Sequence, residues 1–378
     1  MKPILRAERM KPVHSDIRGP LFVEAMKRQK QGIDILKLNT GNPATFGFGL
    51  PDSIKNALME HIQDGVGYCD FKGMPQARQA ICDYETSKGI KGITPDDVFI
   101  GNGVSEVVSF ALTPLLNDGD EVLVPSPSYS LWGNSVYLED GKPVFYTCDE
   151  QANWYPDIQD IRSKITDKTK AIVIINPNNP TGVLYPKEIL LEIIQVAREF
   201  GLLIFADEIY DRLVMDGKQH ISLASLTEDV PVITLNGLSK SHCLCGYRCG
   251  WMVISGPREL TEDYRQGIIQ LTSLRLCANT MAQIVIPAAL DDMDTPTSMV
   301  RPSGRIYEQR EATVRELEKI NGLSFVKNDA AFYVFPKLDV KKFNITNDKQ
   351  FAHDLLDATN ILLVPGSGFD WKDPDHFR

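Results

Sequence analysis

The sequence has no long apolar run. Its apolar stretches, such as residues 284–290, are far shorter than the roughly 20 residues that a membrane-spanning helix needs. The first 20 residues mix Lys, Arg, Asp and His without an apolar core, which is not the pattern of a secretory signal peptide. Low-complexity segments and internal repeats are also missing. We therefore expect a soluble, cytoplasmic protein with no membrane partner.

The sequence contains few cysteines and fewer basic than acidic residues. Only 7 of the 378 residues are Cys, an odd number without framework spacing, and we interpret them as reduced thiols. The 40 Lys and Arg are outnumbered by 50 Asp and Glu, which gives a net charge of -10. Such a surface repels a phosphate backbone, so no nucleic-acid partner is expected. A locally basic pocket for small anions stays compatible with this composition.

Short apolar runs alternate with helical patterns between about residues 95 and 255. A helix is expected over residues 187–200, because apolar residues recur there at helical spacing. Alternation of this kind predicts an α/β fold, with a mostly parallel sheet sandwiched by helices. The expected strands are residues 97–100, 121–124, 171–175, 202–206, 232–235 and 249–254.

After about residue 290 the pattern changes to that of a smaller α+β domain. Helices are expected over residues 303–319 and 349–359, and short strands over 324–327, 331–335 and 361–364. We divide the chain into an arm with part of the small domain (1–45), a large domain (46–290) and a small domain (291–378). We expect the small domain to lack the helices or strands that would cover its sheet. This predicts an exposed apolar surface around residues 361–364.

Polar or aromatic residues follow five of the expected strands where each strand ends. Open parallel sheets bind ligands beyond the carboxyl ends of their strands, so these residues should meet at one edge. They are residues 101–105, 125–129, 176–182, 207–210 and 236–240. The sequence therefore predicts a ligand site at this edge of the sheet.

The residues of this predicted site suit pyridoxal phosphate. Lys240 offers an amine that can form an imine with an aldehyde. Asp207 is expected beside the ring nitrogen, because a carboxylate there keeps that nitrogen protonated and the ring an electron sink. Asn179 and Tyr210 are candidate donors to the ring phenolate, and Tyr129 is a candidate to stack on the ring.

The phosphate of such a cofactor needs donors and a cation. Gly103, Val104 and Ser105 open an apolar helix, and a helix N-terminus with small residues is suited to bind phosphate. Arg248 is expected to bind the same group through its guanidinium, and Ser239 can add a hydroxyl.

Plainer explanations exist for each residue taken alone. Lys240 alone would be a surface lysine, Asp207 a helix N-cap, and residues 176–182 a turn. Their appearance in register favours a site. Residues 101–106 are not a dinucleotide fingerprint, because Glu106 stands where the third glycine belongs.

Three cysteines near Lys240 raise the question of a metal site. Cys243, Cys245 and Cys249 match no zinc spacing, and no pair of His or Cys elsewhere completes four ligands. We interpret them as small apolar residues packed around the lysine loop, and we expect no metal.

Three segments in chain order carry a family resemblance. Asn-Pro-Asn-Asn-Pro-Thr-Gly at 176–182, Asp-Glu-Ile-Tyr at 207–210, and Gly-Leu-Ser-Lys at 237–240 followed by Gly-Tyr-Arg at 246–248 resemble class I/II aminotransferases of the fold-type I pyridoxal-phosphate superfamily. Segments 16–20, 38–44, 67–70 and 375–378 further resemble the bacterial alanine (glutamate–pyruvate) aminotransferases. The resemblance extends from about residue 16 to residue 378.

The resemblance implies roles for residues that the spacing alone does not assign. Arg378 would bind the substrate α-carboxylate, with Gly41 and Asn179 beside it. Tyr68 would reach the phosphate of the neighbouring subunit, in a homodimer whose active sites are shared between subunits.

We therefore expect pyridoxal-phosphate-dependent transamination between an amino acid and a 2-oxo acid, with L-alanine and 2-oxoglutarate as the pair. The amine of Lys240 would move the substrate proton. Other amino-acid specificities, a carbon–sulfur lyase of the same fold and a non-catalytic binding protein are the alternatives.

Two further expectations concern arginines. Arg18 and Arg275 are candidates for the distal carboxylate of glutamate, although each could equally form a structural ion pair. Because the sequence stops at Arg378, we also expect this residue to be loosely held.

Overall fold

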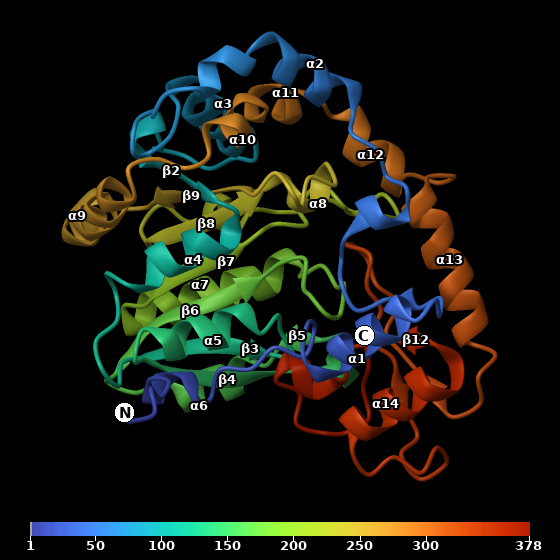
Figure 1. The fold of residues 1–378 in the computed structure, drawn as a ribbon. Coiled ribbons are helices and arrows are strands. Elements are labelled where there is room, and N and C mark those ends of the chain that lie inside the picture. The colour runs from blue at the N-terminus through green and yellow to red at the C-terminus, as the bar shows by residue number, and fades with distance from the viewer. Residues whose placement is uncertain (1) are drawn as a thin grey trace.

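Eight strands form one sheet through the larger part of the molecule (Figure 1), in the order β2-β9-β8-β7-β6-β3-β4-β5. This computed structural model describes residues 2–378. β9 runs antiparallel to β2 and β8, and β5 runs antiparallel to β4, while the other pairs are parallel. The predicted α/β fold with a mostly parallel sheet is thus confirmed. The strands are β2 (Val98–Asn102), β3 (Glu121–Ser126), β4 (Lys142–Asp149), β5 (Tyr155–Pro156), β6 (Thr169–Ile175), β7 (Leu203–Asp207), β8 (Val232–Gly237) and β9 (Cys249–Ser255).

All six strands expected in this region are present, with ends that differ by one or two residues. β4 and β5 were not predicted. The sequence of β4 places Lys142, Pro143 and Asp149 among its apolar residues, and its exposed and buried positions are mixed along its length. Only β5 separates β4 from the sheet edge, so it lacks the continuous apolar run that marks a fully buried strand.

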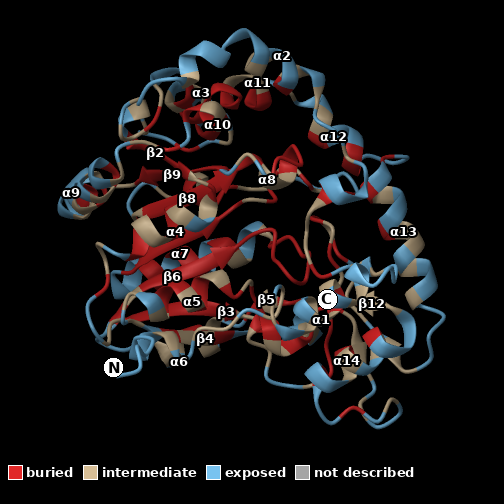
Figure 2. Ribbon diagram, in the orientation of Figure 1, coloured by how far each residue is buried: buried red, intermediate tan, exposed pale blue. Residues whose placement is uncertain are grey.

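Both faces of the sheet are covered by helices, and the strands are the most buried part of the molecule (Figure 2). Ile172 and Ile174 of β6 pack on one face with Leu190 of α7. The alternate residue Val173 joins the opposite face, as the period of two in a strand requires. The covering helices are α4 (Val104–Leu112), α5 (Leu131–Leu138), α6 (Ile158–Lys164), α7 (Lys187–Phe200) and α9 (Arg258–Arg275).

Helix α7 occupies the range predicted for it and ends at Gly201, whose φ is 66°. The short α8 (Leu238–Ser241) follows β8 directly. Helices α2 (Asp52–Glu60), α3 (Pro75–Ser87), α10 (Thr280–Ile284) and α11 (Ile286–Asp291) form a layer beyond β2 and β9 (Figure 1). Among the described residues no single helix could span a membrane by length and hydropathy, and only the bent pair of residues 258–275 and 280–291 passes that test.

The N-terminal segment and the C-terminal part of the chain share a small sheet. β1 (Leu36–Lys37) pairs in parallel with β12 (Ile361–Leu362), and α1 (Pro20–Lys30) packs against the same strand. The other elements there are α12 (Asp294–Val300), α13 (Arg305–Leu317), β10 (Leu323–Ser324), β11 (Lys337–Leu338) and α14 (Asp348–Thr359). The domain boundaries at residues 45 and 290 stay a prediction, and residue 1 lies outside the described residues.

Two expectations for this part are wrong. Residues 331–335 form a turn and an irregular segment instead of a strand, because Ala331 has a φ of 57° and the aromatic side chains that follow pack inward. Residues 361–364 are not an exposed apolar surface either. Leu362 is buried because β1, α1 and α14 cover it, and Val364 is buried in the core cluster that includes Phe335 and Phe369.

A buried group of charges joins the end of α3 to the loop that follows β7. The Nζ of Lys88 lies 2.6 Å from Glu85, 2.9 Å from Glu208 and 3.2 Å from Asp211. Burial alone would lower the pKa of Lys88, but the three carboxylates raise it well above its ordinary value. Glu208, Asp211 and His220 place potential metal-ligand atoms within 4.8 Å of one another, yet the Lys88 ammonium already supplies the cation between the two carboxylates.

Replacing Lys88 by Met should therefore destabilise the fold strongly, because three buried carboxylates would lose their common cation. We expect a loss of about 3–5 kcal/mol in the free energy of unfolding, as for other broken buried ion pairs. Lys91→Met is the matched control, because Lys91 pairs with Glu228 with both side chains exposed, and its loss should change the free energy of unfolding far less. Urea unfolding of both variants at pH 7.5 measures the difference, and equal losses would contradict it.

Candidate active site

Lys240 lies in α8, just beyond the carboxyl end of β8. Its Nζ donates a hydrogen bond to the carbonyl of Gly41 over 2.8 Å, which joins the sheet edge to the N-terminal segment. The ring of Phe332 has its centroid 6.0 Å from the same nitrogen. A lysine predicted to react therefore has its amine directed into the space between these segments.

Asp207 ends the neighbouring strand β7 and is buried. Its Oδ2 accepts a hydrogen bond from Trp132 Nε1 over 3.0 Å, and its Oδ1 accepts a longer one from the backbone of Ile209. Burial raises the pKa of Asp207 to about 6, although the Trp132 hydrogen bond and the charge of Lys240 oppose this shift. Because both donors are neutral, this carboxylate is suited to receive a cationic group of a ligand.

Arg248 and the N-terminus of α4 lie against each other. A Cβ added at Gly103 would be 2.3 Å from Arg248 Nη2, and Gly103 has a φ of +84°, so only glycine suits this position. No side chain of the described residues caps α4, which leaves the donors of its first turn, at Val104 and Ser105, without a capping partner. An uncapped helix N-terminus beside a guanidinium is suited to bind an anion, and the phosphate-binding role of these residues stays a prediction.

The guanidinium of Arg378 is buried between neutral partners. Its Nη1 donates to Asn179 Oδ1 over 2.9 Å, and its Nη2 donates to the carbonyl of Asn39 over 2.5 Å. The rings of Tyr333 and Phe369 lie 4.4 and 4.8 Å from its carbon. Among the described residues its Nε has no hydrogen-bond partner, so the group retains a donor for a ligand.

The expectation of a loosely held Arg378 is wrong. Its backbone N–H donates to the carbonyl of Val364 over 2.9 Å, and the Val364 N–H donates back over 3.3 Å. These bonds and the two rings fix the position of the side chain, which is 8% exposed.

Tyr210 and Tyr333 meet beneath this guanidinium. Their hydroxyl oxygens are 2.9 Å apart, and both side chains are buried. Tyr333 also lies against Gly41, where an added Cβ would be only 2.0 Å from the Tyr333 hydroxyl. Gly41 is thus a glycine because another chain segment occupies the space of a side chain.

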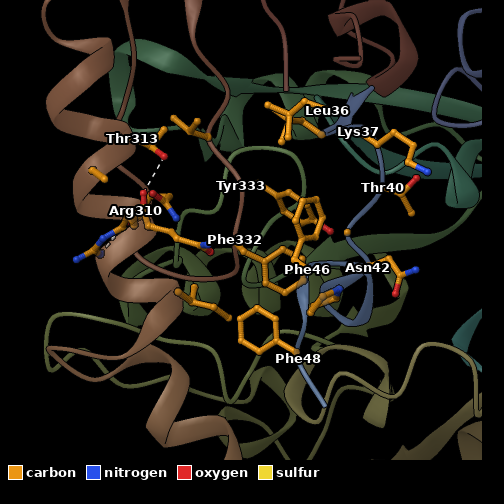
Figure 3. Close-up of a pocket in the computed structure, with 18 of the residues that line it drawn as sticks. Leu36, Lys37, Thr40, Asn42, Phe46, Phe48, Arg310, Thr313, Phe332 and Tyr333 are labelled. Carbon is orange, nitrogen blue, oxygen red and sulfur yellow. Dashed lines mark hydrogen bonds between the residues drawn. The ribbon is translucent and has the colours of Figure 1, made fainter. Parts of the chain in front are cut away.

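A cavity of about 520 Å³ opens beside this region (Figure 3). It shares Gly41 and Tyr333 with the site, and its walls are mostly aromatic and aliphatic, with Phe46, Phe48 and Phe332 among them. Lys240, Asp207 and Arg248 do not line it. It is therefore a space beside the predicted site and not the place where the cofactor residues meet.

Other predicted residues are less tightly placed. Tyr129 and Ser239 are half-buried, and Tyr68 is 84% exposed, as a residue serving a neighbouring subunit has to be. Arg18 is exposed. Arg275 pairs with Glu106 over 2.6 Å and donates to two backbone carbonyls, which favours the structural interpretation of this residue.

The three cysteines near Lys240 behave as packing residues to different degrees. Cys243 and Cys249 are buried, and burial raises the pKa of both thiols to about 12, so both stay protonated. Cys243 contacts the sulfur of Met299 over 3.6 Å. Cys245 is half-buried, with its Sγ 3.0 Å from the carbonyl of Ser239.

Sequence reasoning missed four residues that hold the site together: Trp132, Asn39, Tyr333 and Phe369. Trp132 stands three residues after the predicted stacking residue Tyr129, which was a usable signal. Tyr333 was visible only as part of a supposed strand. Asn39 acts through its backbone carbonyl, for which no side-chain pattern exists.

Known proteins similar to this chain share its whole length. It is 50% identical over 378 residues to the glutamate-pyruvate aminotransferase AlaA of Haemophilus influenzae, covering 100% of this chain and 94% of the relative. A crystal structure of an aminotransferase from Escherichia coli superimposes with a TM-score of 0.98 at 47% identity, over 100% of this chain and 93% of the other. An alanine aminotransferase from Pyrococcus furiosus gives a TM-score of 0.92 at 41% identity, over 99% and 94%.

The family of class I and II aminotransferases matches residues 33–378, which include every predicted site residue except Arg18. The strand-end arrangement of Lys240, Asp207 and Arg248 accords with this match. This chain therefore belongs to the class I and II aminotransferases.

Proposed function

We propose that this aminotransferase exchanges an amino group between L-alanine and 2-oxoglutarate, giving pyruvate and L-glutamate, with pyridoxal phosphate as its cofactor. The observation that carries the proposal is the meeting of Lys240, Asp207, Arg248 and Arg378 around one edge of the sheet. The names of the relatives from Haemophilus influenzae and Pyrococcus furiosus support this substrate pair. A homodimer with shared sites and a cytoplasmic location are part of the same proposal.

The residues present suit pyridoxal phosphate. The uncapped N-terminus of α4 and the Arg248 guanidinium would hold the phosphate, with Ser239 beside them. Asp207 would pair with the ring nitrogen, Asn179 and Tyr210 would donate to the ring oxygen, and Tyr129 would stack on the ring. When bound, the cofactor supplies an electron sink that stabilises the negative charge formed at the substrate α-carbon.

Arg378 determines how a substrate can lie. An α-carboxylate accepts well from a guanidinium, and the unpaired Nε of Arg378 is a buried donor directed at no described group. Asn179 and the Asn39 carbonyl hold the guanidinium in place, so its own rotation costs little on binding. With the carboxylate fixed, the bond to the α-hydrogen can be turned toward Lys240.

Lys240 then acts as the base and the acid. Its amine would take the proton from the substrate α-carbon and give a proton to the bound cofactor. The amino group would be kept on the cofactor for the second substrate, and water would supply the oxygen of the oxo acid. The carbonyl of Gly41 accepts a hydrogen bond from this Nζ over 2.8 Å, which places the amine beside the N-terminal segment. The second substrate reverses these steps.

The first test of this function is a pair of lysine variants. Lys240→Ala should bind the cofactor but fail to convert alanine and 2-oxoglutarate, with a loss of several powers of ten in kcat because the proton carrier is gone. Lys168→Ala, at an exposed surface lysine, is the control and should keep full activity. Borohydride should fix the cofactor to the peptide that contains Lys240, read out by mass spectrometry.

The products decide between reaction types in the same experiment. Pyruvate and glutamate should appear in equal amounts. A carbon–sulfur lyase would leave this substrate pair unconverted and would instead release pyruvate, ammonia and a thiol from an S-substituted cysteine. A borohydride adduct on another lysine would remove Lys240 from its role.

The buried Asp207 should lower the free energy of unfolding at neutral pH, although its charge favours cofactor binding. Its folded-state pKa of about 6 lies above the value of about 3.9 for an unfolded chain, so ionisation costs stability as the pH rises through this window. Asp207→Asn keeps an acceptor for Trp132 and removes this cost. We expect the ligand-free variant to be more stable than the ligand-free parent at pH 8, by about 2–3 kcal/mol.

Below pH 4 the two ligand-free proteins should converge, since Asp207 is then protonated in both states. The variant should also bind pyridoxal phosphate weakly, because the amide cannot pair with a charged ring nitrogen. Thermal melts at pH 4 and pH 8, with and without cofactor, measure both effects. A ligand-free variant that is less stable at pH 8 would contradict the pKa argument.

Arg18 remains our proposed cation for the distal carboxylate of glutamate. It follows Ile17, whose carbonyl accepts a hydrogen bond from Asn39 over 2.6 Å, and the Asn39 carbonyl in turn accepts from Arg378. Arg18→Ala should lower kcat/KM for glutamate by a factor that corresponds to about 2–5 kcal/mol of lost stabilisation. It should lower kcat/KM for alanine much less. Arg275→Ala is the comparison, because its partners are structural, and it should affect both substrates equally. Equal losses in Arg18→Ala would remove Arg18 as the distal cation.

A further inference from the structure

We infer that Tyr333 is a positioning residue of the active site, with its ring packed on the Arg378 guanidinium and its hydroxyl bonded to Tyr210. This inference rests on the proposed function, because it concerns the two residues that would bind the substrate carboxylate and the ring oxygen of the cofactor. The two contacts of Tyr333 can be removed separately.

The ring of Tyr333 holds the guanidinium from one side. Its centroid lies 4.4 Å from the carbon of Arg378, while Phe369 lies 4.8 Å from that carbon. A guanidinium in contact with two aromatic rings is attracted by both. The Tyr333 ring therefore helps to hold the guanidinium of Arg378 in place.

The hydrogen bond between the hydroxyls of Tyr333 and Tyr210 can run in either direction, and a bound cofactor would decide which residue donates. Burial raises the pKa of Tyr210 well above its ordinary value, so that this side chain stays a neutral phenol with a single proton to donate. If Tyr210 donates that proton to the ring oxygen of the cofactor, its own oxygen can only accept from Tyr333 over the 2.9 Å contact. A donor that itself accepts a hydrogen bond is strengthened.

The backbone holds the two tyrosines in this register. Ala331 N–H donates to the carbonyl of Leu213 over 2.9 Å, and Leu213 N–H donates to the carbonyl of Tyr210 over 2.9 Å. The positive φ of Ala331 turns the chain so that the next residues point inward. Gly41 completes the arrangement, because only a residue without a Cβ leaves space for the Tyr333 hydroxyl.

Tyr333→Phe removes only the hydroxyl and tests the bond to Tyr210. In the holoenzyme a weaker hydrogen bond from Tyr210 to the ring oxygen would favour the protonated form of the cofactor. The midpoint of the change in cofactor absorbance with pH should therefore rise by about 0.1–0.6 unit, which corresponds to part of the free energy of a hydrogen bond to a charged group. Tyr210→Phe should raise the midpoint further. In the Tyr210→Phe background, Tyr333→Phe should add nothing, because its effect passes through Tyr210.

Tyr333→Leu removes the ring and tests the contact with Arg378. KM for alanine and for glutamate should rise by about ten- to thirtyfold, with a smaller change in kcat. Phe200→Leu is the control, since Phe200 at the exposed end of α7 packs on Arg162 at 5.9 Å. It should leave both KM values unchanged.

The outcomes separate this inference from the proposed function. A parent protein that binds no pyridoxal phosphate would overturn the function itself. An active holoenzyme whose absorbance midpoint is unchanged in Tyr333→Phe, or shifted equally in the Tyr210→Phe background, would overturn only the role of the Tyr333 hydroxyl. If Tyr333→Leu does not fold, Tyr333→Phe still decides, because it keeps the ring and the packing.

Discussion

The burial of the Arg378 guanidinium among neutral partners is the constraint on which the site depends. A guanidinium stays charged at any pH at which a protein is folded, and its burial is costly without an anion. Here it is held by an amide oxygen, a backbone carbonyl and two aromatic faces. These contacts fix its direction without neutralising it. The N-terminal segment, the loop after β6 and the C-terminal part must all be in place to form them, and the charge they leave uncompensated is what a carboxylate substrate can satisfy.

Asp207 presents the opposite case a short way along the same edge. Its carboxylate is buried with neutral donors, and the cost appears as a pKa of about 6. By contrast, Asp211 behind it lies 3.2 Å from the ammonium of Lys88, and despite its burial that charge keeps the pKa of the Asp211 carboxyl below its ordinary value. Charges that serve the fold are therefore paired within the chain, whereas Asp207 and Arg378 are left for a ligand. Such a site lowers the stability of the ligand-free protein and favours binding.

Local patterns predicted much of this structure, and contacts between distant segments explain what they missed. Six strands and α7 follow from apolar runs, and the rule for strand ends puts Asp207 and Lys240 at the ends of the neighbouring strands β7 and β8, where the structure has them. β4 was not predicted, because a strand near the edge of a sheet needs no continuous apolar run. Residues 331–335 carry a strand-like composition, but their burial comes from packing against Tyr210 and Arg378. Arg378 donates a hydrogen bond to the backbone carbonyl of Asn39, which lies 339 positions earlier in the chain. Every residue has such a carbonyl, so the sequence gives no sign of this contact.

The N-terminal segment holds the proposed substrate-binding arginine more firmly than its small number of elements suggests. His14 lies between Asp370 and Asp16, whose hydrogen bonds raise its pKa to about 9, so it is charged at neutral pH. Its backbone N–H also donates to Asn134 of α5, which ties the segment to the large sheet. Farther along, Asn39 joins Ile17 to Arg378, and β1 pairs with β12. A carboxylate that binds Arg378 therefore acts on a guanidinium whose position depends on both parts of the molecule, so the orientation of the substrate and the docking of this segment are physically coupled.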